Sequence, residues 1–259
     1  MTIEQGLLFA FVVLVAACIE GIVGFGGNIL ALPFLTLFVD IKLAVPILML
    51  VPIINAMLRM CSEYKNIHWP TFWKVVVMGL IGGVVGILIG SYMSETVLKL
   101  LLSIFMVFVA VKGLYEEISG KSIGKSNLQK ALPLYIKVGH GILLFLSGFY
   151  NGAFACGGPF VAIYTTSVLK EKKYFRATMY STVLATMSIM VIQKIMSGVY
   201  TGEVLFTAVL LLPALLIGYV ISSIVQKKID GKLFLKLVYG VILLAGFVMF
   251  GTSVAMLMS

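Results

Sequence analysis

Long apolar runs recur along almost the whole chain, from residue 6 to residue 258, and short polar or glycine-containing breaks separate them. A helix needs about 20 apolar residues to cross the roughly 30 Å hydrocarbon core of a bilayer. The runs are too long and too continuous for the alternating strands of a membrane barrel. The pattern therefore predicts an all-α polytopic membrane protein with ten segments, at residues 5–24, 28–39, 43–60, 72–92, 95–114, 137–156, 159–169, 175–197, 203–225 and 233–257.

A glycine-rich motif occurs twice in this pattern. Residues 21–33 and 152–162 align at an offset of 131 positions, with glycines at matching places. Each half of the chain then holds five segments, an odd number, so the second half is predicted to lie inverted relative to the first. The predicted organisation is a first transmembrane repeat at 1–117, a cytoplasmic linker at 118–134 and a second transmembrane repeat at 135–259.

Composition and charge agree with a membrane protein. Hydrophobic residues make up 61% of the chain, charged residues make up 11%, and the mean hydropathy is +1.13, values far from those of soluble domains. The net charge of +9 does not indicate nucleic-acid binding, because the Lys and Arg residues cluster in the connections, as they do in cytoplasmic loops. We expect a multi-pass protein of the cell membrane, with the lipid bilayer and no nucleic acid as partner, and with both termini outside.

The segments that follow the two motifs are too short to cross the membrane. At 1.5 Å per residue they span about 18 Å and about 16 Å, against a core of about 30 Å. Both are predicted to begin near the midplane, from opposite sides. A helix N-terminus exposes free amides and the positive end of the helix dipole, and a preceding glycine lets an anion come close. The sequence therefore predicts a composite anion site, with Asn28 as an N-cap and Pro159 at a first helical position.

The predicted ligands of the anion are the amides of residues 26–28 and of 157, 158 and 160, with polar side chains nearby. Any one of these side chains has the alternative role of an interhelical hydrogen bond. Cys156 directly precedes the second glycine pair. The candidate substrate-binding residues are Gly24, Gly26, Gly27, Asn28, Asn55, Arg59, Tyr150, Asn151, Cys156, Gly157, Gly158, Pro159 and Phe160.

Two charged residues near the motifs have competing interpretations. Glu20 lies inside a predicted span, where an acid indicates a proton-coupling site or a partner for a cation; the alternative is a paired, solvated position near the inner face. Arg59 could bind an anion in a bidentate manner or anchor its helix at the cytoplasmic side. The first segment either stops near Ile19 and continues as extended chain, or stays helical and tilts.

Other chemistry has little support in the sequence. Cys18, Cys61 and Cys156 are isolated, and no nucleophile or metal-binding constellation is evident, so we expect neither an enzyme nor a cofactor. Glycines at spacings of three and four along residues 79–90 predict close helix packing, within one protomer or in a homodimer.

The paired glycine motifs, the loop Tyr64-Lys65-Asn66-Ile67-His68-Trp69 and the glycine-rich span after it resemble the sulfite exporter TauE/SafE family. The resemblance implies a membrane permease for sulfur-containing anions such as sulfite and small organosulfonates, and several members are regarded as exporters. We expect a secondary transporter in which the two repeats rock around a midplane site. The alternatives are an anion channel and a permease for another small anion, such as thiosulfate or a carboxylate. Ala155, Cys156 and Pro159 stand where this family more typically has glycines.

Overall fold

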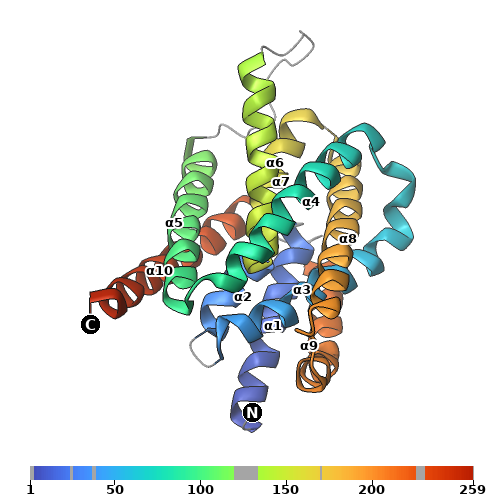
Figure 1. Ribbon diagram of the computed structural model, residues 1–259. Coiled ribbons are helices and arrows are strands. Elements are labelled where there is room, and N and C mark those ends of the chain that lie inside the picture. The colour runs from blue at the N-terminus through green and yellow to red at the C-terminus, as the bar shows by residue number, and fades with distance from the viewer. Residues whose placement is uncertain are drawn as a thin grey trace.

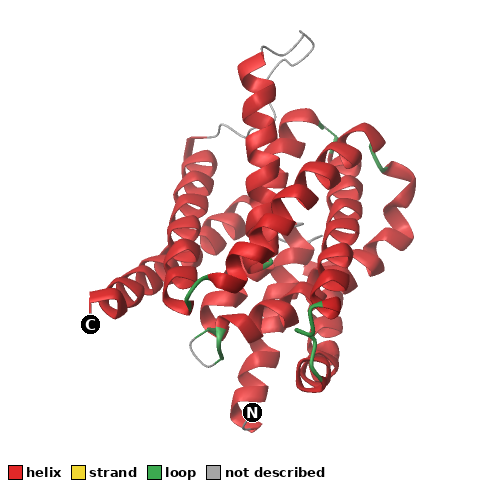
Figure 2. Cartoon of the chain, in the orientation of Figure 1, coloured by secondary structure: helices red, strands yellow, loops and turns green. Residues whose placement is uncertain are grey.

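The chain folds into helices joined by short connections (Figure 2). The computed structural model describes residues 3–23, 26–36, 39–119, 134–169, 171–225 and 231–258, and within these ranges it contains no strand. A short 3-10 turn, η1, follows the third helix at Tyr64–Asn66. The α-helices are α1 (Ile3–Val23), α2 (Gly27–Leu35), α3 (Ile41–Glu63), α4 (Trp69–Tyr92), α5 (Glu95–Ser119), α6 (Leu134–Phe154), α7 (Gly158–Val168), α8 (Lys172–Met196), α9 (Gly202–Val225) and α10 (Gly231–Met258).

Six of these helices are long and apolar enough to cross a membrane, namely α3, α4, α5, α8, α9 and α10. The helix α1 adds a shorter apolar stretch at Gly6–Ile22. The prediction of an all-helical, multi-pass membrane protein is therefore confirmed. The outside location of the two termini stays a prediction.

The ten predicted segments correspond one to one with α1–α10, with differences at their ends. The helix α1 continues to Val23, so of the two alternatives for the first segment, the helix that stops near Ile19 is wrong. The helix α2 ends at Leu35, four residues early, where the Thr36 hydroxyl donates to the Pro33 carbonyl at 3.0 Å. Most of the predicted linker lies outside the described residues, which stop at Ser119 and resume at Leu134.

The main helix pairs join the first half of the chain to the second. The helix α4 packs along α6, α1 along α9, α3 along α8 and α5 along α10. Figure 1 shows α4 crossing α6 in this interlocked arrangement. One large apolar core draws buried side chains from both halves, for example Leu48, Met106, Phe154 and Met190. The two halves therefore do not form separate packing units.

Glycines bring the backbones of α4 and α6 into contact. A methyl group at Gly82 or Gly86 would overlap the carbonyl oxygen of Phe145 or Phe149, and one at Gly148 would overlap that of Gly79. The glycine face that suggested a homodimer is thus covered by α6 of the same chain, and it no longer argues for a second copy. The homodimer itself stays a prediction.

Adding one methyl group at this contact is expected to destabilise the protein. Gly86→Ala places its Cβ on the Phe149 carbonyl, and overpacking of this kind costs about 1–3 kcal/mol. The thermal midpoint of the purified protein in detergent should fall. The matched control is Gly240→Ala on α10, where an added Cβ meets nothing within 4 Å. Equal midpoints for the two variants would contradict the close packing of α4 on α6.

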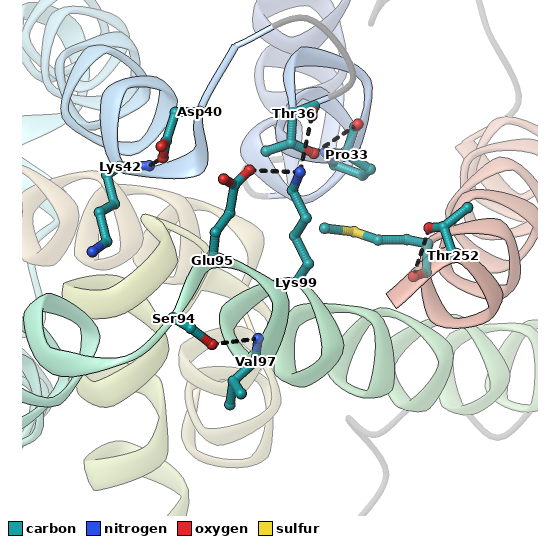
Figure 3. A network of polar contacts seen from close by, with 10 residues as sticks. Pro33, Thr36, Asp40, Lys42, Ser94, Glu95, Val97, Lys99 and Thr252 are labelled. Carbon is teal, nitrogen blue, oxygen red and sulfur yellow. Dashed lines mark hydrogen bonds and ion pairs between the residues drawn. The ribbon is translucent and has the colours of Figure 1, made fainter. Parts of the chain in front are cut away.

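A polar network ties the end of α2 to α5 (Figure 3). The Lys99 ammonium lies 2.6 Å from Glu95 Oε1 and donates to the Thr36 carbonyl at 3.3 Å. The Asp40 carboxylate accepts from the Lys42 amide at 2.7 Å and so caps the first turn of α3. The Lys42 ammonium itself points away from these groups (Figure 3). These contacts fix the C-terminal end of α2. The N-terminal end of the same helix borders the candidate site described below.

Candidate functional site

The two glycine motifs meet at one small cavity. Each short helix begins at it, and the 9 residues of α2 and the 11 of α7 are only about 14 Å and about 17 Å long. Helices α1, α3, α6 and α8 complete the wall. The residues that line the cavity are Glu20, Gly26, Gly27, Asn28, Ile29, Pro52, Asn151, Ala155, Cys156, Gly158, Pro159, Val183 and Met187.

A left-handed residue precedes each short helix. Gly26 has a φ of 91° and is the N-cap of α2, and Ala155 has a φ of 57° between α6 and α7. For a residue with a Cβ this conformation costs about 1–2 kcal/mol. Among the described residues, Ala155 is the one non-glycine residue with a positive φ. Such strain concentrates at functional sites, where the surrounding contacts hold it in place.

The side chain of Asn28 joins the two motifs. Its Nδ2 donates to the carbonyl of Leu48 on α3 at 2.9 Å and to that of Ala155 at 3.0 Å. Because both partners are acceptors, the amide orientation is fixed and Oδ1 is left without a partner in the described part of the chain. The prediction of Asn28 as the N-cap of its helix is therefore wrong. Gly26 takes that place, and the Asn28 side chain reaches across to the second glycine motif.

The second motif uses two of its predicted anion donors internally. The Gly157 amide donates to Asn151 Oδ1 at 2.6 Å, and the Phe160 amide donates to the Gly157 carbonyl at 3.2 Å. The Gly158 amide has no acceptor among the described residues. The Cys156 thiol donates to the Phe154 carbonyl at 3.0 Å. In this conformation, Gly158 is therefore the amide of the second motif that is available to a ligand.

Arg59 lies buried beside the cavity. Its side chain donates to Asn55 Oδ1 at 3.2 Å and to Ser222 Oγ of α9 at 2.9 Å. The guanidinium also lies over the rings of Tyr219 and Tyr180, at 4.9 and 5.5 Å from their centroids. Arg59 is 5% exposed, so it does not act as a solvated anchor at the membrane surface. Its polar and cation–π contacts link α3, α8 and α9.

Glu20 links the Arg59 contacts to the cavity. Its carboxylate lines the cavity and is attracted electrostatically by Arg59. Glu20 is 6% exposed, and its Oε2 has no hydrogen-bond partner in the described ranges, so the solvated alternative does not hold. The next residue, Gly21, lets α1 lie close to Ser222 of α9 and Arg59 of α3. A Cβ at this position would overlap Ser222 Oγ and lie 2.5 Å from Arg59 Nη2. The acid and the base are thus held on two helices beside one cavity.

The structure brings together eight of the fourteen predicted site residues. Glu20, Gly26, Gly27, Asn28, Asn151, Cys156, Gly158 and Pro159 line the cavity.

Five others lie outside the cavity lining, and Gly24 falls outside the described residues. Asn55 and Arg59 form the adjacent polar cluster, and Gly157 packs against Ser147 and Asn151. Tyr150 and Phe160 stack on Phe105, with ring centroids 4.1 and 5.1 Å away. A direct contact of these residues with substrate stays a prediction.

Sequence reasoning missed five residues of the lining, namely Ile29, Pro52, Ala155, Val183 and Met187. Pro52 and Val183 stand 131 positions apart, the same offset that relates the two glycine motifs. Applying the offset of 131 positions to the third segment of each half therefore predicts that Pro52 and Val183 occupy equivalent positions beside the cavity.

The cavity offers both donor and acceptor groups in a very small space. The Gly158 amide is a donor, whereas Glu20 Oε2 and Asn28 Oδ1 are buried acceptors without partners in the described structure. The space for the centres of water-sized molecules is about 30 Å³, which suffices for about two waters. The described residues contain no group of three or more metal-ligating side chains. This conformation therefore presents a small site with polar groups between the two glycine motifs.

Comparison with known proteins identifies a family. The sequence model of the family described as sulfite exporter TauE/SafE matches residues 9–249, which is nearly the whole chain. No curated protein and no solved structure matches the chain.

Proposed function

The chain belongs to the sulfite exporter TauE/SafE family, and from this we propose that it is a secondary transporter that exports sulfur-containing anions, such as sulfite or a small organosulfonate. The substrate binds in the cavity between the two glycine motifs, and access to that cavity alternates between the two sides of the membrane. The bond from Asn28 Nδ2 to the Ala155 carbonyl is the observation that carries the proposal, because it joins the starts of both short helices at one point.

The pattern of helix contacts supports an inverted duplication. The offset of 131 positions pairs α1 with α6, α2 with α7, α3 with α8, α4 with α9 and α5 with α10. Exchanging the members of each pair turns the α1–α9 contact into the α6–α4 contact, and it leaves the α3–α8 and α5–α10 contacts unchanged. A two-fold relation between the halves produces this behaviour. It would place equivalent surfaces on opposite sides of the cavity, as alternating access requires.

The unpartnered acceptors suggest that a proton accompanies the anion. A sulfonate group carries only acceptor oxygens, so it cannot satisfy Glu20 Oε2 or Asn28 Oδ1, and a buried polar group without a partner costs about 1–3 kcal/mol. A proton on Glu20 turns the carboxylate into a donor and removes its repulsion of the anion. We therefore assign Glu20 as the coupling group. The alternative is a cation bound with the substrate.

The proposed function is tested by purified protein in two assays. Thermal shift or calorimetry compares sulfite, sulfate, thiosulfate, sulfoacetate, isethionate and acetate, and flux of the best ligand is then measured in proteoliposomes. We expect binding of a sulfur oxyanion and slow, saturable flux. Preference for acetate would refute the substrate class, and an ohmic current across a planar bilayer would favour the channel alternative.

Glu20→Gln is expected to uncouple transport from protons. With one proton moved per anion, a pH difference of one unit drives about tenfold accumulation of the anion. The neutral amide keeps the size of Glu20 but cannot carry a proton, so the variant should equilibrate its substrate without accumulating it. Proteoliposomes with an imposed pH gradient measure the difference. Glu171→Gln, which removes an exposed carboxylate next to Lys173, is the control. Full accumulation by Glu20→Gln would show that another group couples the flux.

A further inference from the structure

We propose that a second cavity in this chain is an oxyanion site, with the ammonium groups of Lys42 and Lys194 as its two cations. The cavity has a volume of about 200 Å³ and lies among the ends of α3, α4, α5, α6 and α8. Its place on the transport path rests on the proposed function, whereas its ability to bind an oxyanion does not.

The two lysines give the second cavity a positive charge without a countercharge in its wall. No acidic residue lines the cavity, and neither ammonium has an ion pair among the described residues. The Asp40 carboxylate caps the backbone of α3, and Figure 3 shows the Lys42 side chain pointing away from Asp40 and Glu95. An anion that enters the cavity therefore meets two cations that are not already neutralised there.

Lys194 carries the stronger argument, because it is only partly exposed within a membrane-spanning helix. It lies in the last turn of α8, where the helix dipole favours a cation by about 0.3–1 kcal/mol. The dipole does not occupy the hydrogen-bond donors of the ammonium, which remain available to oxyanion oxygens.

The second cavity lies next to the first along two helices. Val45 lines it and precedes Pro52 of the first cavity by seven residues on α3, while Lys194 follows Met187 by seven residues on α8. Seven helical residues correspond to two turns, or about 10 Å. Both displacements lead toward the end of the molecule where α3 begins and α8 ends, and the distribution of basic residues predicts that this end lies outside.

The end of α6 forms a wall shared by the two cavities. Asn151 and Ala155 line the first cavity, and Gly152 and Ala153 between them line the second. Leu48 on α3 and Met190 on α8 stand between the two levels and are 0% and 1% exposed. The two cavities are thus neighbouring sites with the buried apolar residues Leu48 and Met190 between them, and an anion that leaves the first cavity outward is expected to reach the lysines next.

The walls also limit the chemistry of the ligand. Apart from the lysines, the cavity is lined mainly by apolar and small residues, among them Ile41, Ile87 and Leu98. A ligand with a compact oxyanion group on a short carbon chain fits both the lysine ammonium groups and the apolar part of the wall. A sulfonate substrate and the phosphate group of a lipid share this head-group chemistry, so the experiment must separate the two sources.

Lysine protection tests binding at the second cavity directly. Purified protein is treated with an amine-acylating reagent, with and without isethionate, and modification of each lysine is measured by mass spectrometry. We expect isethionate to slow the modification of Lys42 and Lys194 about tenfold while leaving the control Lys65, an exposed residue of η1, unchanged. Equal rates at Lys194 with and without isethionate would overturn the proposal, whatever the flux assay gives.

Flux measurements then place the site on the path. In phosphatidylcholine vesicles, Lys42→Gln/Lys194→Gln should raise the KM for sulfonate flux about tenfold, as expected for the loss of a charge-assisted contact, with a maximal rate within about twofold of the wild type. Lys65→Gln should behave as the wild type. Protection without flux in the wild-type protein would refute the proposed function and leave the second site standing. An unchanged KM in the double variant would remove the site from the path.

A lipid arm identifies the source of the oxyanion. The protection experiment is repeated in vesicles of phosphatidylcholine with and without phosphatidylglycerol. Protection by isethionate in pure phosphatidylcholine supports a substrate site. Protection by phosphatidylglycerol that isethionate does not reproduce would assign the lysines to a lipid phosphate and overturn the substrate assignment.

Discussion

Asn28→Asp is expected to abolish anion binding, with a loss of affinity of about a hundredfold or more. The substitution keeps the shape of the side chain but removes the donor that holds the carbonyls of Leu48 and Ala155. It also places a second carboxylate in the small cavity that Glu20 lines. Loss of two neutral hydrogen bonds, each contributing about 0.5–1.5 kcal/mol, added to electrostatic repulsion of the ligand, accounts for this factor. Calorimetric titration with the best sulfur oxyanion measures it.

The control for this variant is Asn66→Asp, which adds the same charge in the η1 turn, outside the cavity lining. It should bind as the wild type does. Size-exclusion profiles of both variants verify that the fold is intact before titration. If Asn28→Asp binds with wild-type affinity while folded, the cavity between the motifs is not the anion site.

Arg59→Gln is expected to be the most destabilising substitution considered, with a loss of about 3–5 kcal/mol. Removing one partner of a buried charged pair leaves the other charge uncompensated, and here Glu20 would remain buried beside a neutral side chain. The contacts with Ser222 and with the Tyr219 and Tyr180 rings would be lost as well. The thermal midpoint in detergent, together with the yield of inserted protein, measures the effect.

Two comparisons separate the buried pair from ordinary salt bridges. Arg176→Gln breaks a partly exposed pair with Glu63, in which the nitrogen and oxygen atoms lie 3.1 Å apart, and pairs near the surface contribute about 0–1 kcal/mol. The double variant Glu20→Gln/Arg59→Gln removes both buried charges and should recover part of the lost stability. If the double variant is as unstable as the sum of the two single variants, Arg59 does not act through Glu20.

Much of the fold could be predicted from the sequence, because lipid restricts the possible backbone structures so strongly. Apolar length and breaker residues located all ten helices in order. Helix ends were less accessible, since they depend on contacts between distant segments. Asn28 illustrates this: it resembles a local N-cap in the sequence, but its side chain bonds to carbonyls 20 and 127 positions away.

The site could be predicted where its signal repeats. The glycine motifs recur at one offset, and the structure places residues of both motifs around one cavity. The burial of Arg59 near Glu20 could not be predicted, because hydropathy placed Arg59 at a helix end near the aqueous surface. Its burial depends on Ser222 and Tyr219 of α9, and no short-range pattern links those residues to Arg59. Likewise, the Tyr150 ring stacks on Phe105 and does not line the cavity, and no sequence pattern indicated this stacking.

The glycine contacts between α4 and α6 also determine which parts of the molecule can move. Carbonyl oxygens of each helix fit into the glycine gaps of the other, and the Cys18 thiol of α1 donates to the Gly218 carbonyl of α9 at 3.4 Å in the corresponding pair. Because helices packed this closely are expected to move together, we do not expect the first 117 residues to swing as a block, which revises the expectation that the two repeats rock against each other. We expect each moving body to contain helices from both halves of the chain, with the cavity at the boundary between the two bodies.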